Sequence, residues 1–425
     1  MFIIYDLIFL VIAIIYLPVY LFKRKFHKDF LRRLGILPKE LKLNRPIWIH
    51  AVSVGEAMAM RGLLEKLRAN LANKAFVIST VTVTGNKIAK TLAKKCDFVT
   101  YLPLDLSFCL KPVINRINPC LFIIAETELW PNLISYLKRK NIPIIIVNGR
   151  ISDSSFKGYR LISFFIRPFL RKVSLFCVQT KVDAQRLISL GVDKNKIEIT
   201  GNMKFDIKDD RDDKKDHTDD KLKLGLKSRE KLFVAGSTHP GEEEIILEAY
   251  KELLAKFPDL KLLIAPRHPE RAAQINNLIT KFDFLPLRVS SQGSLTSQEA
   301  SKPAVFILDT IGQLLSFYNI ADIVFVGGSL VKKGGHNILE PVSLGKPVII
   351  GAYMFNFRDI ADLFLESHAV LLINNKEELK TALTKLLNNP QEAMELGWRG
   401  KDLILNNQGA TQRNIKYIIS YATSS

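Results

Sequence analysis

Short apolar runs rich in β-branched residues alternate with helix-length segments along most of this chain of 425 residues. A parallel sheet covered by helices on both faces produces that rhythm. In the first half the runs begin at Ile47, Phe76, Cys120, Ile142 and Ser174, and in the second half at Lys231, Leu260, Ala304, Ala321 and Lys346. We therefore expect an α/β protein with two successive Rossmann-like halves that face each other across a cleft, an arrangement suited to two different bound substrates.

The alternation breaks between Asp206 and Lys223, where almost every side chain is charged. The Asp pairs there are compatible with metal binding, but a solvated segment between domains accounts for the run without a cation. Four parts are expected, namely an anchor at residues 1–22, a first domain at 23–207, a charged segment at 208–227 and a second domain at 228–425.

The amino-terminal segment from Phe2 to Phe22 is apolar except for Asp6. About 20 helical residues at ~1.5 Å each reach ~30 Å, the thickness of a hydrocarbon core. Six basic residues follow between Lys23 and Arg33, which places the rest of the chain in the cytoplasm by the positive-inside rule. The segment lacks the charge order of a secretory signal. It predicts a membrane anchor, and a helix lying in one leaflet is the alternative, given Asp6 and Pro18.

The formal charge of +19 is strongly basic and is compatible with nucleic acid, an anionic membrane or a phosphorylated substrate. No RNP signature, zinc-finger spacing or basic leucine zipper accompanies it, which disfavours nucleic acid. The four cysteines lie far apart without metal-ligand spacing, so a reduced body facing the cytosol is expected.

The stretch HAVSVGE, from His50 to Glu56, ends an apolar run with a glycine turn and begins a helical pattern. Open α/β sheets bind ligands at the carboxyl ends of their strands. A carboxylate at that edge, here Glu56, can act as the general base that deprotonates an incoming hydroxyl group. The structural alternative is that Glu56 only complements the helix dipole.

The second half has three strand-to-helix turns suited to a nucleotide phosphate. One contains Arg267 and His268, and arginine matches phosphate oxygens bidentately. Another is GGSLVKKGGHNILEP, from Gly327, whose glycines permit a ligand to approach the backbone closely. A helix is expected to open there near His336 and Asn337, with its N–H groups directed at an anion. Glu340, about one turn later, is placed to accept a hydrogen bond from a ribose hydroxyl. The third, GSTHPGEEE from Gly236, has the same form.

Two further stretches of the first half bear possible catalytic groups. ETELWPN, from Glu126 to Asn132, puts two acids at a strand exit, although one could cap a helix and Trp130 could be a core residue. TGNMKFD, from Thr200 to Asp206, contains Lys204, which could neutralise charge on a leaving phosphate.

In this order, HAVSVGE, ETELWPN, GNMKFD, APRHPER and GGSLVKKGGHNILEP resemble the 3-deoxy-D-manno-octulosonic acid (Kdo) transferases of lipid A glycosylation, over nearly the whole chain. The resemblance implies an inverting, metal-independent glycosyltransferase of the GT-B fold at the cell inner membrane. Its first domain would take a lipid A precursor (lipid IVA) and its second CMP-Kdo. Transfer would be to the 6'-hydroxyl, and anionic membrane lipids would be further partners.

The resemblance also implies roles for individual residues. Glu56 matches the family's general base, and Glu126 and Lys204 match positions of transition-state stabilisation. The expected CMP contacts are Pro266, Arg267, Ile311, Gly312, Gln313, Asn337, Ile338, Leu339 and Glu340. Gln313 departs from the acid expected there, which puts that one contact in doubt.

Two alternative functions differ from this one. Another membrane-associated GT-B transferase or epimerase that uses a UDP-sugar would keep both halves, but would not be expected to combine HAVSVGE with ETELWPN. A non-catalytic, membrane-tethered basic scaffold would account for the charge, but not for the glycine turns.

Overall fold

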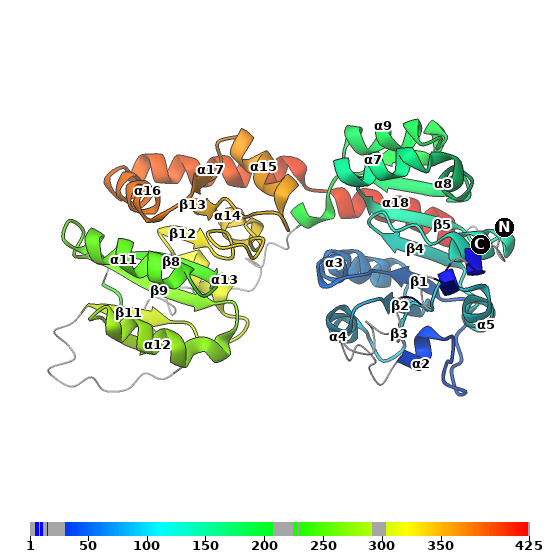
Figure 1. Ribbon diagram of the computed structural model, residues 1–425, viewed down its shortest axis with the longest axis horizontal. Coiled ribbons are helices and arrows are strands. Elements are labelled where there is room, and N and C mark those ends of the chain that lie inside the picture. Colours follow the sequence, from blue (N-terminus) through cyan, green and yellow to red (C-terminus); the bar gives the residue numbers. More distant parts are fainter. Residues whose placement is uncertain are drawn as a thin grey trace. The chain divides into compact units, whose positions relative to one another are not determined.

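The computed structural model describes residues 5–7, 9–11, 15, 30–206, 224–227, 229–290 and 303–423. They form two compact units, Met1–Asp206 with Asn407–Ser425, and Ile207–Asn406 (Figure 1). Most of the predicted anchor at residues 1–22 and most of the charged segment at 208–227 lie outside the described residues. Within the described ranges, no helix has both the length and the apolar character needed to cross a membrane.

The first unit contains a parallel seven-stranded sheet in the order β3-β2-β1-β4-β5-β6-β7. Its strands are β1 (Ile47–His50), β2 (Phe76–Thr80), β3 (Phe98–Tyr101), β4 (Leu121–Ala125), β5 (Ile144–Gly149), β6 (Leu175–Val178) and β7 (Ile197–Ile199). Its helices are α2 (Phe30–Arg33), α3 (Val54–Asn70), α4 (Val83–Leu92), α5 (Ser107–Ile117), α6 (Pro131–Arg139), α7 (Asp153–Leu161), α8 (Ser163–Leu170), α9 (Lys181–Ser189) and α18 (Ala410–Thr423), with short 3₁₀ turns at Lys194–Lys196 (η1) and Met203–Phe205 (η2).

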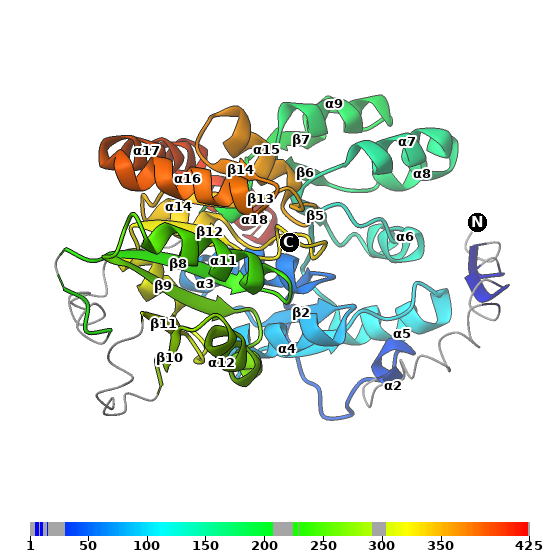
Figure 2. The same cartoon turned by 60° about the vertical axis from the view of Figure 1, so that its left-hand side comes forward.

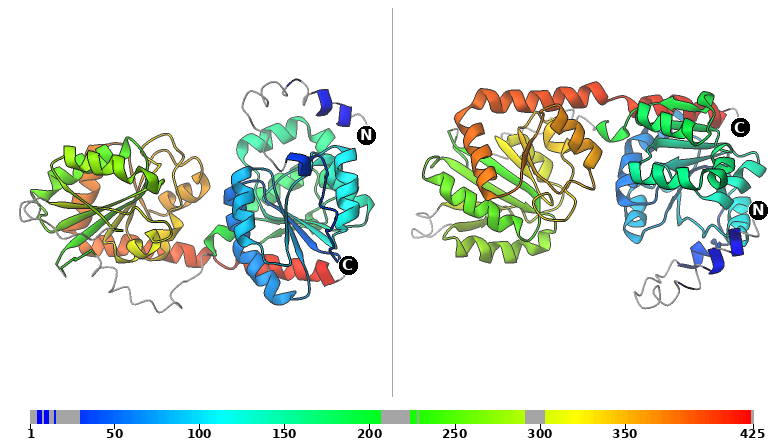
Figure 3. Two further views of the ribbon diagram at one scale, coloured as in Figure 1. Left: turned by 90° about the horizontal axis from the view of Figure 1, so that it is seen from below. Right: turned by 45° about the horizontal axis from the view of Figure 1, so that its top comes forward.

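Both faces of this first sheet are buried, which is why its strands read as continuous apolar runs and not as alternating ones. Ile47 and Ile49 of β1 pack in one core with α3, α4 and α18. Trp48, between them, points to the opposite core, which α5, α6, α8 and α9 complete. Helices therefore cover both faces (Figure 3), as expected for a doubly wound fold.

The second unit repeats this plan with the parallel order β10-β11-β9-β8-β12-β13-β14. Its strands are β8 (Lys231–Thr238), β9 (Leu260–Pro266), β10 (Leu285–Arg288), β11 (Ala304–Ile307), β12 (Ile323–Val326), β13 (Val348–Gly351) and β14 (Leu371–Ile373). Its helices are α11 (Glu242–Leu254), α12 (Ala272–Lys281), α13 (Leu314–Ile320), α14 (Leu339–Ser343), α15 (Arg358–Glu366), α16 (Lys376–Asn388) and α17 (Pro390–Asn407), with a 3₁₀ turn, η4, at Pro269–Arg271. Helices α11, α12 and α16 pack on one core of this sheet (Figure 2).

Each sheet has a central point at which the strand order reverses. In the first unit it lies between β1 and β4, and in the second unit between β8 and β12. Loops diverge to opposite faces at such a point and leave a crevice at the carboxyl ends of the two strands. Those two loop pairs are where a ligand is expected on each unit.

The carboxyl-terminal helix α18 belongs to the first unit, so the prediction that residues 228–425 form a single domain was wrong at its end. Ile415 and Ile418 are buried in the core beside α3. The Asp206 carboxylate accepts hydrogen bonds from the backbone N–H groups of Gly409 and Thr411, which fixes the start of the helix. The apolar face of α18 is therefore covered by the first sheet, which the sequence rhythm alone did not indicate.

Candidate active site

Glu56 lies in the first turn of α3, directly after β1, at the switch point of the first sheet. Ser53 is the N-cap of this helix. One carboxylate oxygen of Glu56 accepts the Val52 N–H at 2.7 Å, and the other accepts the Ser53 hydroxyl at 2.8 Å. Burial raises the pKa of Glu56, and Glu126 adds to the rise, while these hydrogen bonds oppose it. The carboxylate is thus held in place and made a stronger base.

Glu126 and Lys204 meet at the same edge of the first sheet. Glu126 directly follows β4 and adopts a left-handed backbone with φ 58°, and its Oε1 lies 3.2 Å from Nζ of Lys204. Both side chains are 27% exposed, so a ligand can reach the pair. The turn that contains Lys204 is fixed by Asn148 of β5, whose Oδ1 accepts the Met203 N–H at 3.0 Å. The sequence predicted both residues as site residues, but not their ion pair.

Glu128 is the third carboxylate at this edge. Burial raises its pKa to about 7, and the negative charges of Glu56 and Glu126 add to the effect. Like charges in a partly desolvated site cannot all ionise freely. The cluster of Glu56, Glu126 and Glu128 therefore holds fewer negative charges at neutral pH than three exposed carboxylates would.

This raised pKa predicts a pH-dependent stability effect for Glu128→Gln. The folded state binds the Glu128 proton more tightly than the unfolded state, so this stabilisation is complete below the ordinary glutamate pKa and is lost as pH rises through about 7. The variant should therefore have a higher melting temperature than the wild type at pH 8 and a matching one at pH 4. Thermal unfolding at both pH values measures this, and an equal difference at both would contradict it.

Two buried ring nitrogens lie near the same edge of the first sheet, one on His50 at the end of β1 and one on Trp130 just before α6. Nε2 of His50 and Nε1 of Trp130 have no hydrogen-bond partner among the described residues, and their ring centroids lie 6.4 Å apart. His50 is held through Nδ1 by the Ser79 hydroxyl at 3.0 Å, and burial lowers its pKa to about 4, so the ring is neutral. Both nitrogens are thus buried without a hydrogen-bond partner in the part of the chain that the structure describes. Sequence reasoning singled out neither as a site residue, although both lie within the quoted motifs.

On the second unit, histidines gather with Arg267 at the switch point between β8 and β12. Nε2 of His239, after β8, lies 2.9 Å from Nε2 of His336, and the two rings stack at 5.1 Å. Burial lowers the pKa of His336 to about 4, and the Arg267 guanidinium adds to this. Arg267 follows Pro266 at the end of β9 and is exposed. With His336 uncharged, the Arg267 guanidinium supplies the positive charge that suits this edge of the second unit to an anion.

The other predicted nucleotide contacts lie on the same edge. The Ile311-Gly312-Gln313 turn follows β11, with Ile311 88% exposed and Gly312 at φ 87°. The Gln313 side chain accepts the Thr310 hydroxyl at 2.6 Å. Asn337 donates to Glu340 at 3.0 Å, and burial raises the pKa of Glu340. Ile338 and Leu339 are buried behind that pair.

The helix that follows β12, α14, differs from the expected one. It begins at Leu339 rather than near His336, and it spans only Leu339–Ser343. The Asn337 side chain accepts the Leu339 N–H at 3.2 Å and so occupies one of the expected anion donors. One N–H group at the amino end of this helix is therefore already satisfied by a side chain.

The glycines of the β12 loop serve the protein's own packing. The buried Glu242 carboxylate accepts the N–H groups of Gly328, Ser329 and Leu330 at 2.7, 3.0 and 2.9 Å. A Cβ on Gly327 would lie 2.6 Å from a backbone oxygen of Ser237. The backbone nest that the glycines form is thus filled by Glu242, and not open to a phosphate. The signal in the sequence is the run of three acids after Gly241, although the residue positions alone did not predict this contact.

No group of three or more His, Cys, Asp or Glu side chains within the described ranges is arranged to hold a metal ion. The Asp-rich segment falls outside those ranges. Metal independence therefore stays a prediction.

Comparison with known proteins agrees with the sequence motifs. Residues 28–207 match the family described as 3-deoxy-D-manno-octulosonic-acid transferase (kdotransferase), and residues 293–403 match glycosyl transferases group 1. The 3-deoxy-D-manno-octulosonic acid transferase of Haemophilus influenzae is 39% identical over 376 residues, which cover 88% of this chain and 87% of that protein. The enzyme of the same name from Chlamydophila psittaci is 32% identical, over 91% of this chain and 89% of that one.

Among solved structures, a UDP-GlcNAc 2-epimerase from Neisseria meningitidis covers 89% of this chain and 100% of its own, with a TM-score of 0.57 and 13% sequence identity. That likeness shows the fold alone, and it is consistent with the expected GT-B class. The long, ordered matches to the sequence relatives carry the assignment. The chain is a glycosyltransferase and belongs to the 3-deoxy-D-manno-octulosonic acid transferase family.

Proposed function

We propose that this enzyme transfers Kdo from CMP-Kdo to the 6'-hydroxyl of a lipid A precursor, in lipopolysaccharide core biosynthesis. The observation that supports this most directly is the position of Glu56 with the Glu126–Lys204 pair at the switch point of the first sheet. The names of the relatives in the Kdo transferase family support Kdo as the transferred sugar. The donor and the acceptor are proposed from the sequence resemblance.

In the proposed reaction Glu56 takes the proton of the acceptor hydroxyl. The freed oxygen then bonds to the anomeric carbon of Kdo on the face opposite the phosphate. The bond from that carbon to the phosphate oxygen breaks, its electron pair leaves with CMP, and the configuration inverts. The Ser53 and Val52 hydrogen bonds aim the base, and its raised pKa favours proton uptake.

The departing phosphate is the second centre of charge in this mechanism. Arg267, beside His239 and His336, is the proposed donor-phosphate ligand, because a guanidinium pairs with phosphate oxygens bidentately. Lys204 is proposed to stabilise the charge that develops on the leaving group, with Glu126 fixing its ammonium group.

The anchor and localisation are part of the proposal. Residues 1–22 would tether the enzyme to the cell inner membrane, with both units on the cytoplasmic side, where basic residues attract anionic lipids. Within that segment, the described Asp6 accepts hydrogen bonds from the Asn132 side chain at 2.6 Å and the Ser107 N–H at 3.2 Å. This contact holds Asp6 against the body of the first unit rather than in lipid.

The direct test is a product assay. The purified enzyme is incubated with a tetra-acylated lipid A precursor and CMP-Kdo, and the lipid is weighed by mass spectrometry. A product heavier by one or more Kdo units is expected, and it should still form in the presence of chelator. UDP-sugars replace CMP-Kdo in a parallel arm. Transfer only from a UDP-sugar would favour the alternative transferase, and strict dependence on magnesium would refute the metal-free mechanism.

Arg267→Ala should chiefly weaken nucleotide binding. A charge-assisted contact to phosphate contributes about 1.5–3 kcal/mol, which corresponds to a roughly tenfold to hundredfold loss of affinity for CMP. Calorimetry with CMP measures this, with Arg288→Ala on the edge strand β10 as the matched control. Unchanged affinity in the Arg267 variant would show that the phosphate binds elsewhere.

A further inference from the structure

Asp6 is the one charged residue of the sequence between Phe2 and Phe22, and a membrane anchor gives it no purpose. A carboxylate within a hydrocarbon core is costly, so acidic residues in apolar segments usually have a separate role. In the structure the Asp6 carboxylate contacts Ser107 and Asn132, which lie 101 and 126 positions further along the chain. Asp6 is therefore part of the folded first unit.

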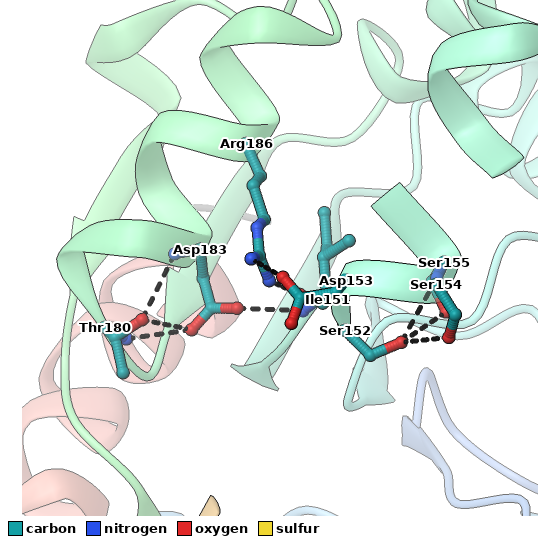
Figure 4. A network of polar contacts seen from close by, with 8 residues as sticks. All are labelled: Ile151, Ser152, Asp153, Ser154, Ser155, Thr180, Asp183 and Arg186. Atoms are coloured by element: carbon teal, nitrogen blue, oxygen red, sulfur yellow. Dashed lines mark hydrogen bonds and ion pairs between the residues drawn. The ribbon is translucent and has the colours of Figure 1, made fainter. Parts of the chain in front are cut away.

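Helices α5 and α6 of that unit begin without a side-chain cap of their own. Their N-cap positions are Leu106 and Trp130, whose side chains accept no hydrogen bond from the helix. Helices α3, α4, α7 and α9 are instead capped by a Ser or Thr side chain, and Figure 4 shows two of these caps, Ser152 of α7 and Thr180 of α9. The first N–H groups of a helix have no partner within it, so those of α5 and α6 need an acceptor from elsewhere in the chain.

Two aspartates from other segments supply the missing caps. The Asp105 carboxylate accepts the N–H groups of Asn132 at 3.1 Å and Leu133 at 2.8 Å, in the first turn of α6. The Asp6 carboxylate accepts the Ser107 N–H, in the first turn of α5, at 3.2 Å, and also accepts the Ser107 hydroxyl. A negative charge at the amino end of a helix also complements the helix dipole. Asp6 therefore caps α5 from the amino terminus of the chain.

The side chain of Asn132 joins the two caps. Asn132 is 2% exposed, and its amide nitrogen donates to the Asp105 carbonyl at 2.8 Å and to Oδ1 of Asp6 at 2.6 Å. An amide NH₂ group has two hydrogens, so these two acceptors use both. The Tyr5 hydroxyl, next to Asp6, donates to the Asp105 carboxylate. Loss of the Asp6 carboxylate would thus deprive a buried Asn132 hydrogen of its acceptor in the first turn of α6.

The start of α6 is tied to the carboxylate cluster of Glu56, Glu126 and Glu128. Five residues separate the end of β4 from α6, and Glu126 and Glu128 are two of them. This stretch is held at its beginning by the Glu126 N–H, which donates to the Val147 carbonyl of β5 at 2.9 Å. Its other end runs directly into the first turn of α6, which the two caps hold. A shift of that turn would therefore move Glu128 relative to the rest of the cluster.

We propose that Asp6 is a positioning residue for the catalytic edge of the first unit: by capping α5 and holding Asn132, it fixes the start of α6 and the two glutamates that precede this helix. Asp6 takes no part in the chemistry itself. The amino terminus then has a role in turnover that is separate from tethering. The inference rests on the proposed function in one respect, since it takes the carboxylate cluster to act in transfer.

The test compares two replacements of Asp6 in the full-length protein, solubilised in detergent. Asp6→Ala removes both acceptor oxygens. Asp6→Asn removes the charge but keeps the oxygen that accepts from Ser107 and Asn132, and its amide group can donate to the Ser107 hydroxyl. Leu7→Ala, at a 58% exposed position of the same segment, is the matched control.

Turnover at saturating donor is the first measurement, at a temperature well below the melting temperature of every variant. We expect it to fall roughly tenfold to a hundredfold in Asp6→Ala, because a displacement of about 1 Å in an active site can lower a rate by a factor of about 10². Asp6→Asn should restore most of the loss, and Leu7→Ala should match the wild type. CMP affinity should be unchanged in all three variants, because the proposed nucleotide contacts lie on the second unit.

Hydrogen exchange at residues 126–133 is the second measurement, and it should be faster in Asp6→Ala alone. A lower melting temperature with wild-type turnover would show that Asp6 only stabilises the fold, which would overturn the proposal. Equal losses of turnover in Asp6→Ala and Asp6→Asn would overturn it as well, because they would assign the effect to the charge rather than to the hydrogen bonds. An equal loss in Leu7→Ala would have the same consequence.

The outcome is separate from that of the product assay. Hydrogen exchange needs neither donor nor acceptor, so it reports on the contact even in a protein that transfers no Kdo. A protein that shows faster exchange in Asp6→Ala without Kdo transfer in the wild type would lose the proposed reaction, while the capping role of Asp6 would stand. Wild-type turnover in Asp6→Ala would remove only the positioning role.

Discussion

Glu56→Gln is expected to lower turnover by about two to four orders of magnitude, the usual contribution of general acid–base catalysis. The amide keeps the shape of the side chain and can still accept a hydrogen bond from Val52 or Ser53, but it cannot take a proton from the acceptor. Folding and CMP affinity should therefore stay close to those of the wild type. Single-turnover rates with saturating donor, together with melting temperatures, measure the two effects separately.

Glu65→Gln is the matched control for this experiment. Glu65 lies on the same helix, and its exposed carboxylate pairs with Arg61 at 3.3 Å. Loss of such a surface pair has little effect on stability and should leave turnover unchanged. Near-normal turnover in the Glu56 variant would remove this residue from the proposed mechanism, whereas equal losses in both variants would point to damage to the helix.

Glu242→Ala is expected to destabilise the second unit by about 3–5 kcal/mol, because breaking a buried polar network leaves several N–H groups without an acceptor. The fully buried carboxylate accepts from Gly328, Ser329, Leu330 and also from the His239 N–H at 2.9 Å. The β12 loop should then lose its shape, and CMP affinity should fall with it. Hydrogen exchange at residues 326–330 measures the loop directly, without assuming two-state unfolding.

Glu244→Ala provides the comparison. Among the described residues, its carboxylate accepts only the Gly241 N–H, at 3.0 Å, in an exposed capping contact. Loss of such a cap costs typically about 1 kcal/mol. If both variants exchange at the same rate in residues 326–330, Glu242 does not hold the loop and the nest must be stabilised by other groups.

The sequence predicted the central strands of both sheets but not their edges. Strands β3, β7, β10 and β14 were missed, and they are the four edge strands of the two sheets. A central parallel strand is buried on both faces and reads as a continuous apolar run. An edge strand such as β7, with the sequence IEI, is only partly buried and presents no such run.

In the site, the predicted features depend on contacts between residues close in sequence, and the unpredicted ones depend on contacts between distant residues. Both hydrogen bonds to the Glu56 carboxylate come from residues within four positions of it, so the motif itself reports its geometry. Lys204 and Glu126 meet across 78 positions, and Glu242 reaches Gly328 across 86. Without aligned homologues, such pairs cannot be derived from one sequence, because spacing along the chain does not constrain them.

The return of α18 to the first unit makes the second unit an insertion within the first. Synthesis on the ribosome proceeds from the amino terminus, and domains fold largely as they emerge. The strands of the first sheet are made first, but Ile415 and Ile418, which cover their core, are made only after the second unit. The second unit can therefore finish folding while the first still exposes apolar surface. The nascent chain should depend on chaperone protection until α18 leaves the ribosome.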